Sequence, residues 1–488
     1  MRNVKFKTLA WSSVLVLLVI FLGRYWIERG LDHVDFLDTR EYVIDFTDDS
    51  GRRVKMEAPA SRIISLYSAH TENLFALELD KEIIGVGTSE SYPIEFRDKP
   101  VFDYKSDPEK VIAARPDLVL IRPFIERKQP DFVDALRQSG ISVVSFYPQS
   151  QDAFDAYIMN LGLVTGREKM AERKLKAFHE QMSALRTITK DIEPKINVFF
   201  ESSDVEIKTV TPDSMAARAI ETAGGINIAS DAQAITKGSS IAAYGPERVL
   251  EKADQIDAYV TQRGVMGAGG NLHTISIRPG FDTVKAVRNG KVLEINQKII
   301  SSPTFRQVKG AYDLARFFYP EVMDDLDHLR KEEPLNRVDA AEIYVRYDHR
   351  PFFAPTASYY DDTYAGHTYG MFEDVPSSYD RFDFVETAVK AGFMDGFKAI
   401  DEETEEEIEL FDVEGHVTRD EFAKALFLFY DLVPQDVHIE ISDIENCDNQ
   451  KIVQTLVDHG VLGLEEGKFN PDRPVTGLEV IETLENIK

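Results

Sequence analysis

Short apolar runs alternate with amphipathic segments over the first 320 residues of the chain. In the first part, the apolar runs predict strands and the amphipathic segments between them predict helices. The predicted strands are 62–66, 83–87, 118–121 and 141–144, and the predicted helices are 72–79, 108–114 and 130–138. Strands that alternate with helices predict a mostly parallel sheet with helices on both faces. A turn-rich segment between 42–47 and 53–56 predicts a preceding hairpin.

The segment from Gln151 to Lys190 has the hydrophobic spacing of a long helix. Apolar residues recur on both sides of a break at Gly166, which predicts either a kink or two helices laid end to end. They are Phe154, Tyr157, Ile158, Leu161, Val164, Leu175, Phe178, Met182 and Leu185. We expect this helical spine to join two α/β halves at a fixed separation and to leave a cleft between them. The alternative is an ordinary long helix inside one α/β domain.

The pattern of strands and helices restarts after the spine. The predicted strands are 196–200, 258–260 and 291–295, and the predicted helices are 214–223, 247–252 and 307–318. The stretch Asp107–Ile112 is echoed by Gly245–Leu250, each shortly before an aspartate and a predicted strand. One such element in each half supports two related lobes.

Composition narrows the classes of function. The chain has 488 residues, 43% of them hydrophobic, which is enough for two to four structural units with real cores. Its formal net charge of −28 argues against a nucleic-acid partner, since a polyanion would be repelled over most of the surface. Cys447 is the single cysteine, so the sequence predicts neither an intrachain disulfide nor a thiolate metal site.

The first 30 residues have the pattern of a membrane anchor or signal sequence. Arg2, Lys5 and Lys7 precede an uncharged apolar run over residues 8–23. Neither a small-x-small cleavage site nor a cysteine for lipid attachment follows the run, so we expect an uncleaved anchor, with a cleaved signal peptide as the alternative. In either case we expect the rest of the chain to be extracytoplasmic, in the cell envelope or at the cell surface.

Motifs spread over residues 61–321 resemble the helix-spined solute-binding proteins that deliver ferric siderophores, haem or cobalamin to ABC importers. These motifs are Arg62–Leu66 with Thr71–Leu74, Ala114–Val119, Leu161–Arg167, Ala223–Ala229 and Ala286–Val292. The resemblance implies two α/β lobes joined by a long helix, the class III solute-binding protein fold. It also implies a small-molecule metal chelate and an ABC transporter permease as partners, with no catalysis and no resident cofactor.

The resemblance also assigns roles to individual residues. In that family one glutamate on each lobe docks onto arginines of the permease, and Glu109 and Glu247 match those positions; the alternative is that both simply favour a helix dipole. Ligands of parallel sheets bind at the carboxyl ends of the strands, where aromatic rings stack on a planar chelate and cations pair with its oxygens. The predicted ligand-binding residues are Tyr67, Ser68, His70, Tyr92, Phe102, Tyr104, Arg122 and Tyr147 from the first lobe, and Lys237, Tyr244, Arg263, His273 and Arg306 from the second.

Two further classes of function are weaker alternatives. A related family with the same spine binds bare zinc or manganese, but His70 and His273 are the two histidines that the lobes offer outside the spine, too few for a cage around a naked ion. Chelatases share the two-lobed architecture, but the sequence contains no nucleophile–base pair and no phosphate-binding glycine loop to support an enzyme.

The composition changes after Met323, and an internal repeat of helix, loop and capped helix follows. The repeat resembles the S-layer homology module, which holds proteins to cell-wall polymers or peptidoglycan. Thr418, Arg419 and Glu421 match the signature that forms the wall-binding pocket of that family, whereas Gly477 replaces the arginine in the last copy. A capping box is the alternative for these residues. The stretch Leu335–Ile343 resembles a degenerate further copy.

The sequence therefore predicts a two-lobed α/β protein followed by an all-α-rich region of S-layer homology repeats. The predicted parts are an N-terminal anchor or signal (1–30), a solute-binding domain (58–322) with an N-lobe (58–150), spine (151–190) and C-lobe (195–322), a linker with a degenerate repeat (323–370), and two repeats (371–488). The predicted function is extracytoplasmic substrate binding for an ABC importer of an iron chelate or cobalamin. A wall-organising surface protein whose lobes do not serve transport is the alternative.

Overall fold

The computed structural model describes residues 44–486, apart from 91, 149, 237, 266, 324–325, 351, 354–369, 377, 401–406, 430–431, 433 and 436–437. The predicted N-terminal anchor lies outside these residues. Among the helices described, none combines the length and the apolar character that a membrane crossing needs.

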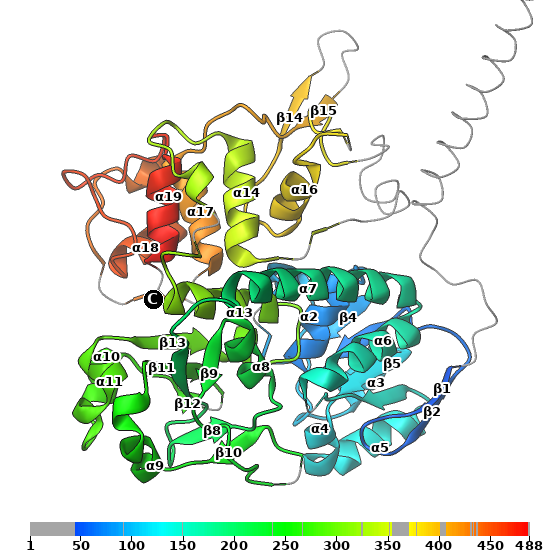
Figure 1. The fold of residues 1–488 in the computed structure, drawn as a ribbon. Coiled ribbons are helices and arrows are strands. Elements are labelled where there is room, and N and C mark those ends of the chain that lie inside the picture. The colour runs from blue at the N-terminus through cyan, green and yellow to red at the C-terminus, as the bar shows by residue number, and fades with distance from the viewer. Residues whose placement is uncertain are drawn as a thin grey trace, which may run out of the picture.

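The N-lobe is built on a parallel sheet of order β4-β3-β5-β6 (Figure 1). Its strands are β3 (Ile63–Ser65), β4 (Ile83–Val86), β5 (Leu118–Ile121) and β6 (Ser142–Ser145), and its helices are α2 (Ser68–Ala76), α3 (Glu109–Ala113), α4 (Pro123–Lys128) and α5 (Pro130–Gln138). Both faces of the sheet are covered, because Leu118 and Val119 are fully buried in two different clusters. The predicted hairpin is present as β1 (Ile44–Thr47) and β2 (Arg53–Met56), with Ile44 opposite Met56.

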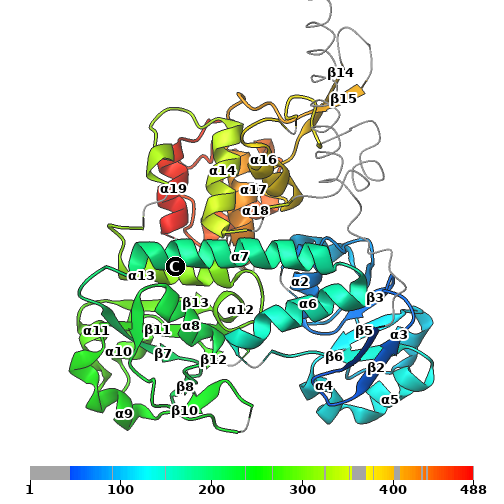
Figure 2. The ribbon, with the colours of Figure 1, turned by 45° about the vertical axis from the view of Figure 1, so that its right-hand side comes forward.

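The spine consists of two helices, α6 (Phe154–Thr165) and α7 (Glu168–Thr189). The sequence predicted a kink or two helices laid end to end, and both predictions are wrong. The chain reverses at Gly166, whose φ is 69°. The two helices then pack against each other. Gly162 permits this approach, since a Cβ there would come 3.0 Å from the Cβ of Ala171. Helix α7 alone crosses both lobes (Figure 2).

The C-lobe repeats the architecture of the N-lobe. Its main sheet has the order β12-β11-β7-β9, with β13 paired to β11, and it is parallel except for β12. The strands are β7 (Ile196–Glu201), β9 (Gly225–Asn227), β11 (Ala258–Gly264), β12 (Gly267–Ala268) and β13 (Val292–Asn296), with a hairpin of β8 (Lys208–Val210) and β10 (Ile241–Ala243). The helices are α8 (Met215–Thr222), α9 (Pro246–Glu251), α10 (Leu272–Ser276), α11 (Lys285–Arg288), α12 (Gln297–Ile300) and α13 (Gln307–Phe318).

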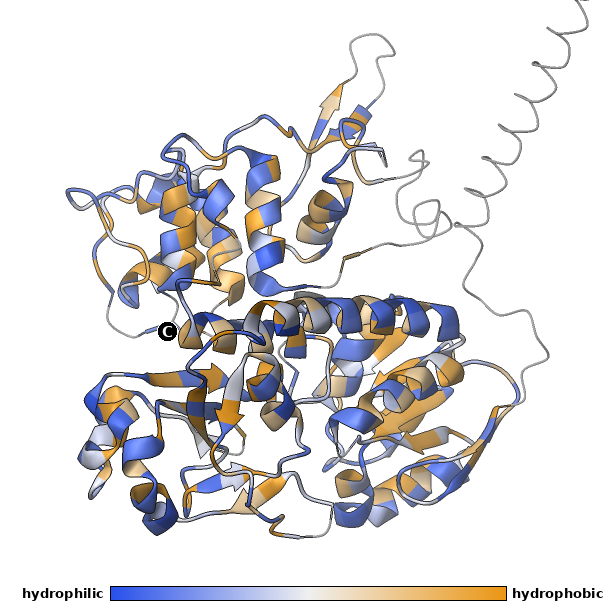
Figure 3. Cartoon of the chain, viewed as in Figure 1, coloured by the Kyte–Doolittle hydropathy of each residue, from blue (hydrophilic) through white to orange (hydrophobic). Residues whose placement is uncertain are grey.

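The two lobes keep separate sheets but share one apolar core. A single buried cluster contains Leu118 of the N-lobe, Phe154 and Phe178 of the spine, and Leu314 of α13. The rings of Phe154 and Phe178 lie 5.2 Å apart, and Phe305 of the C-lobe closes on both at 5.6 and 6.0 Å. The bands of apolar residues that run through both lobes are visible in Figure 3. Because interiors are close-packed, this continuity predicts lobes that move little against each other.

The C-terminal domain has its own core and a closed ring of three backbone segments. The amide of Leu335 donates to the carbonyl of Val475, that of Val475 to Val417, and that of Val417 back to Leu335, at 2.8, 3.0 and 3.0 Å. A helix follows each segment: α14 (Arg337–Asp348), α17 (Arg419–Phe429) and α19 (Gly477–Glu485). The domain also contains α16 (Phe382–Lys390), α18 (Gln450–Asp458) and a hairpin of β14 (Phe397–Ile400) and β15 (Glu407–Leu410).

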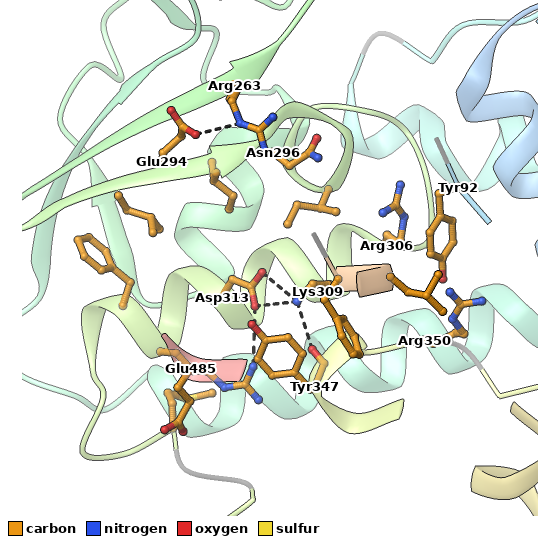
Figure 4. A pocket seen from close by; sticks show the side chains of 18 of the residues that line it. Tyr92, Arg263, Glu294, Asn296, Arg306, Lys309, Asp313, Tyr347, Arg350 and Glu485 are labelled. Carbon is orange, nitrogen blue, oxygen red and sulfur yellow. Dashed lines mark hydrogen bonds and ion pairs between the residues drawn. The ribbon is translucent and has the colours of Figure 1, made fainter. Parts of the chain in front are cut away.

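The C-terminal domain rests on the spine side of the two lobes (Figure 1). Tyr92 of the N-lobe lies between two guanidinium groups, that of Arg306 from the C-lobe at 3.7 Å and that of Arg350 from the C-terminal domain at 4.4 Å. Its hydroxyl donates to Asp348 at 3.2 Å. A separate ion pair joins Lys390 to Asp80 at 2.7 Å. We call the meeting of Tyr92, Arg306 and Arg350 the three-way junction (Figure 4), because these residues come from the N-lobe, the C-lobe and the C-terminal domain. The segment predicted as a linker contributes α14 and part of this junction.

Candidate ligand-binding site

The carboxyl ends of the N-lobe strands bring three predicted ligand-binding residues together. Tyr67 follows β3, Arg122 follows β5 and Tyr147 follows β6. The rings of Tyr67 and Tyr147 lie 6.1 Å apart, and the guanidinium of Arg122 lies 4.9 Å from the ring of Tyr67. Phe124, which the sequence analysis did not single out, flanks the same guanidinium at 4.8 Å. We call Tyr67, Arg122, Phe124 and Tyr147 the aromatic–arginine cluster.

The electrostatics of this cluster suit a neutral-to-anionic ligand with a planar part. Burial raises the pKa of Tyr67 and, likewise, of Tyr147, so both phenols stay protonated at neutral pH. No carboxylate pairs with Arg122 among the described residues. A guanidinium held against rings keeps its charge and its donors for a ligand oxygen.

His70 packs edge to face against Tyr67 with ring centroids 5.0 Å apart, but it lies on the core side of that ring and not in a loop as predicted. Helix α2 begins at Ser68, whereas the sequence predicted a loop over 67–70, and the earlier start turns His70 into the core. The side chain is fully buried, its Nδ1 lies 2.7 Å from the hydroxyl of Tyr157, and its Nε2 lies 3.0 Å from the carbonyl oxygen of Ile121. Burial lowers the pKa of His70 to about 4. A neutral histidine whose two ring nitrogens are both hydrogen-bonded inside the protein has no nitrogen left for a ligand.

The carboxyl end of the C-lobe sheet carries a closed ion pair instead. Glu201, the last residue of β7, is 1% exposed. It accepts from Arg278 at 2.5 and 3.1 Å and from the hydroxyl of Tyr259. Next to it, the loops after β7 and β11 expose the apolar side chains of Val205 and Val265. The sequence analysis predicted neither feature. Glu201 and Arg278 are 77 positions apart, and no local pattern predicts a contact at that separation.

The other predicted ligand-binding residues are dispersed. In the N-lobe, Phe102 and Tyr104 pack against the buried cluster under the sheet, and Ser68 opens α2. Tyr92 and Arg306 meet at the three-way junction, where Arg306 also pairs with Glu72 at 2.7 Å.

The remaining C-lobe candidates also lie apart from one another. Tyr244 is buried against Phe199, with ring centroids 5.2 Å apart, and belongs to a core cluster of the C-lobe. Arg263 pairs with Glu294 at 2.9 Å, and His273 is exposed on α10. Lys237 lies outside the described residues.

Glu109 and Glu247 occupy equivalent places on the two lobes. Each lies in the first turn of a short helix, α3 or α9, beside a proline, and each is exposed. No ion pair holds either carboxylate among the residues that the structure describes. Both carboxylates are therefore accessible to an external partner.

The wall-binding residues predicted in the C-terminal domain bond within that domain, with Arg419 buried and the side chain of Glu421 still 44% exposed. The amide of Thr418 donates to the carboxylate of Glu421 at 2.9 Å and the amide of Glu421 donates to the hydroxyl of Thr418 at 3.2 Å, which is a capping box. Arg419 is 5% exposed and donates to the carbonyls of Phe469 and Gly463 at 3.0 and 2.8 Å. Arg337 in the first unit repeats this arrangement, donating to the carbonyl of Phe411 at 2.7 Å. These arginines join consecutive units of the ring.

The described residues contain no group of three or more His, Cys, Asp or Glu side chains that could hold a metal ion. The residues brought together at the N-lobe edge are rings and a cation, which can stack on a ligand and pair with its oxygens.

Comparisons with known proteins match the two parts of the chain separately. The family model of the periplasmic binding proteins matches residues 63–299, and that of the S-layer homology domain matches residues 440–481. The chain is similar to an uncharacterized ABC transporter substrate-binding lipoprotein of Bacillus subtilis, with 26% identity over 64% of this chain and 98% of that protein. It is 25% identical to a vitamin B12-binding protein of Vibrio cholerae over 51% of this chain and 85% of that protein. A solved solute-binding protein of Staphylococcus epidermidis, described as a possible iron-binding protein, aligns with a TM-score of 0.48 and 25% identity, over 54% of this chain and all of that one.

Proposed function

We propose that the chain is the extracytoplasmic substrate-binding protein of an ABC importer for an iron chelate or cobalamin, from the premise that the family model of the periplasmic binding proteins matches residues 63–299 and that of the S-layer homology domain matches residues 440–481. The aromatic–arginine cluster carries the proposal, because it supplies rings and a charged donor at the carboxyl edge of a parallel sheet. The relative named for ABC transport supports the role in an importer, and the relative named for vitamin B12 supports the class of substrate.

Absorption spectroscopy of the purified full chain tests the substrate class. Titration with a ferric siderophore, haem and cobalamin should show one of them binding with 1:1 stoichiometry and a shifted visible spectrum. Binding of none of the three, with a cooperative thermal transition intact, would contradict the proposal.

We further propose that Glu109 and Glu247 dock the protein onto permease arginines. Two exposed, unpaired carboxylates at a fixed spacing make a two-point electrostatic contact. The double variant Glu109→Ala/Glu247→Ala should lose most uptake in cells while the purified variant keeps its ligand affinity within about twofold. The control Glu172→Ala/Glu180→Ala removes the same charge from the spine and should leave uptake unchanged. Lost ligand affinity in the first variant would contradict a docking role.

The C-terminal domain is proposed to hold the protein to the cell-wall polymer. Its support is the S-layer homology match together with the closed ring, in which we count residues 335–348 as a third repeat. The full chain should sediment with purified walls. Because Arg419 is buried, Arg419→Ala is scored together with its melting temperature: lost sedimentation at an unchanged melting temperature supports direct recognition, and retained sedimentation excludes it.

A further inference from the structure

The turn between β1 and β2 reaches the carboxyl edge of the N-lobe sheet, where the aromatic–arginine cluster lies. The amide of Asp49 donates to the carbonyl of Ser145 at 3.0 Å, and the amide of Ser145 donates to a carboxylate oxygen of Asp48 at 3.1 Å. Ser145 is the last residue of β6, and Tyr147 of the cluster follows it closely in the chain. The hairpin is therefore joined to the end of the strand that delivers Tyr147 to the cluster.

A carboxylate of this turn holds the backbone of Tyr147 directly. The Oδ2 atom of Asp49 accepts the amide of Tyr147 at 2.6 Å. A hydrogen bond from a backbone amide to an ionised carboxylate is shorter and stronger than one between neutral groups. The next residue, Pro148, has no amide to donate. Asp49 therefore binds the last backbone donor before the chain leaves the sheet edge.

The same turn contacts the helix that carries the other half of the cluster. The guanidinium of Arg52 pairs with Glu126 of α4 at 2.6 Å. Arg122 is the N-cap residue of α4, and Phe124 lies in its first turn. Arg137 of α5 pairs with the carboxylate of Glu126 as well, at 2.9 Å. The link to α4 is thus shared between two arginines, whereas the link to Tyr147 depends on Asp49.

The hairpin is packed firmly enough to serve as a support. Val54 and Met56 are buried in the core that the two lobes share. The ring of Phe46 stacks on that of Phe146, with centroids 5.7 Å apart and an interplanar angle of 16°. Asp49 itself is exposed, so replacing its side chain does not open the core. Such a residue can hold a binding group in place without contributing much to the stability of the fold.

We propose that Asp49 is a positioning residue of the ligand-binding site, whose carboxylate fixes Tyr147 by its backbone so that the ring of Tyr147 stays beside that of Tyr67. This role rests on the proposed function and adds to it a residue outside the cluster itself. A ring that is held before the ligand arrives does not have to be ordered in the complex, and the saved entropy appears as affinity.

Hydrogen exchange tests the bond without any ligand. In the full chain labelled with 15N-tyrosine, the amide of Tyr147 should exchange about tenfold faster in Asp49→Ala, because it loses its acceptor. Asp49→Asn keeps an oxygen that can accept the same amide, so its exchange should stay close to that of the unaltered protein. Equal exchange in Asp49→Ala and the unaltered protein would overturn the proposal.

Spectroscopic titration with haem, cobalamin and a ferric siderophore tests the consequence. Asp49→Ala should weaken binding of the chelate that the unaltered chain takes up by about fivefold, at an unchanged melting temperature. Asp49→Asn should restore the affinity to within about twofold, since the bond and not the charge positions the ring. The control Asp45→Ala removes the same charge from β1, where Asp45 pairs with Arg53, and should leave the affinity unchanged.

The outcomes separate this role from the proposed function. Faster exchange in Asp49→Ala without weaker binding would overturn the positioning role and leave the proposed function intact. Equally weak binding in Asp49→Ala and Asp49→Asn would assign the effect to charge, which also overturns positioning. If the unaltered chain bound none of the three chelates, the proposed function would fail, and the positioning role with it.

Discussion

The two lobes share a topology but treat charge at their carboxyl edges in opposite ways. In the N-lobe, Arg122 lies against the rings of Tyr67 and Phe124, and no carboxylate of the described residues forms an ion pair with it. In the C-lobe, Arg278 is neutralised by the buried carboxylate of Glu201. An arginine held by rings stays available to a ligand, whereas an arginine held by a buried acid stabilises its own loop. Equivalent edges of related sheets therefore hold an arginine in two ways, against aromatic rings in the N-lobe and against a buried acid in the C-lobe.

Breaking the C-lobe pair should give the largest effect. Glu201→Gln removes the charge that compensates Arg278 and weakens the bond to Tyr259, so we expect a loss of about 3 kcal/mol in the free energy of unfolding. Urea denaturation of the full chain measures it. The exposed pair of Arg218 and Glu221 in the same lobe is the control, since Arg218→Gln should cost less than about 0.5 kcal/mol. Equal costs for the two variants would refute the structural role of Glu201.

Acid should act on the N-lobe through His70. Its folded pKa of about 4 lies below the ordinary 6.5, so the unfolded chain takes up the proton first as pH falls. This contribution is fully present above pH 6.5 and is lost progressively down to pH 4, by about 3 kcal/mol in total. In His70→Gln, the free energy of unfolding should therefore fall by about 3 kcal/mol less between pH 6.5 and pH 4 than in the unaltered protein. An unchanged dependence would show that the imidazole is not buried as described.

Glu90 provides the opposing control in the same lobe. Burial raises the pKa of its carboxyl to about 7 from an ordinary 4.5. Here the folded protein holds the proton more tightly, so stability is lost as pH rises from 4.5 to 7. Glu90→Gln should therefore steepen the loss of stability on acidification, in the direction opposite to His70→Gln.

Arg122 should give the smallest free-energy change and the most selective one. Arg122→Gln should weaken binding of the chelate found by spectroscopy about tenfold, which corresponds to about 1.4 kcal/mol, at an unchanged melting temperature. Arg127→Gln alters an exposed cation on the same helix, α4, and should leave affinity unchanged. If Arg278→Gln reduced affinity as much as Arg122→Gln without loss of stability, the contrast between the lobes would fail.

Periodic patterns were enough to predict most elements, because burial on a sheet or helix face repeats at a fixed interval. The predicted helix 307–318 coincides with α13, and the predicted hairpin is present as β1 and β2. The reversal at Gly166 was not predicted, because a glycine in a helical pattern marks a break but not its angle. Gly162, whose missing side chain lets α7 approach, looks like any other small residue in the sequence.

The candidate site was predicted only where it depends on strand ends. Tyr67, Arg122 and Tyr147 could be placed together because parallel strands end at the same edge. His70 was misplaced because the start of α2 was expected four residues too late, and helix termini are the least reliable part of a sequence pattern. The ion pair of Glu201 and the stacking of Tyr92 join residues far apart in the chain, so only the folded structure reveals them.

The ring of Leu335, Val417 and Val475 also fixes the order in which the protein can be completed. The segment of Leu335 bonds to Val475, which is made much later. The lobes can therefore fold during synthesis, as domains generally do from the amino terminus, whereas the ring can close only once Val475 has been made. A chain terminated before Val475 would have folded lobes and an unclosed C-terminal segment with exposed apolar residues. Such a segment is a substrate for proteases.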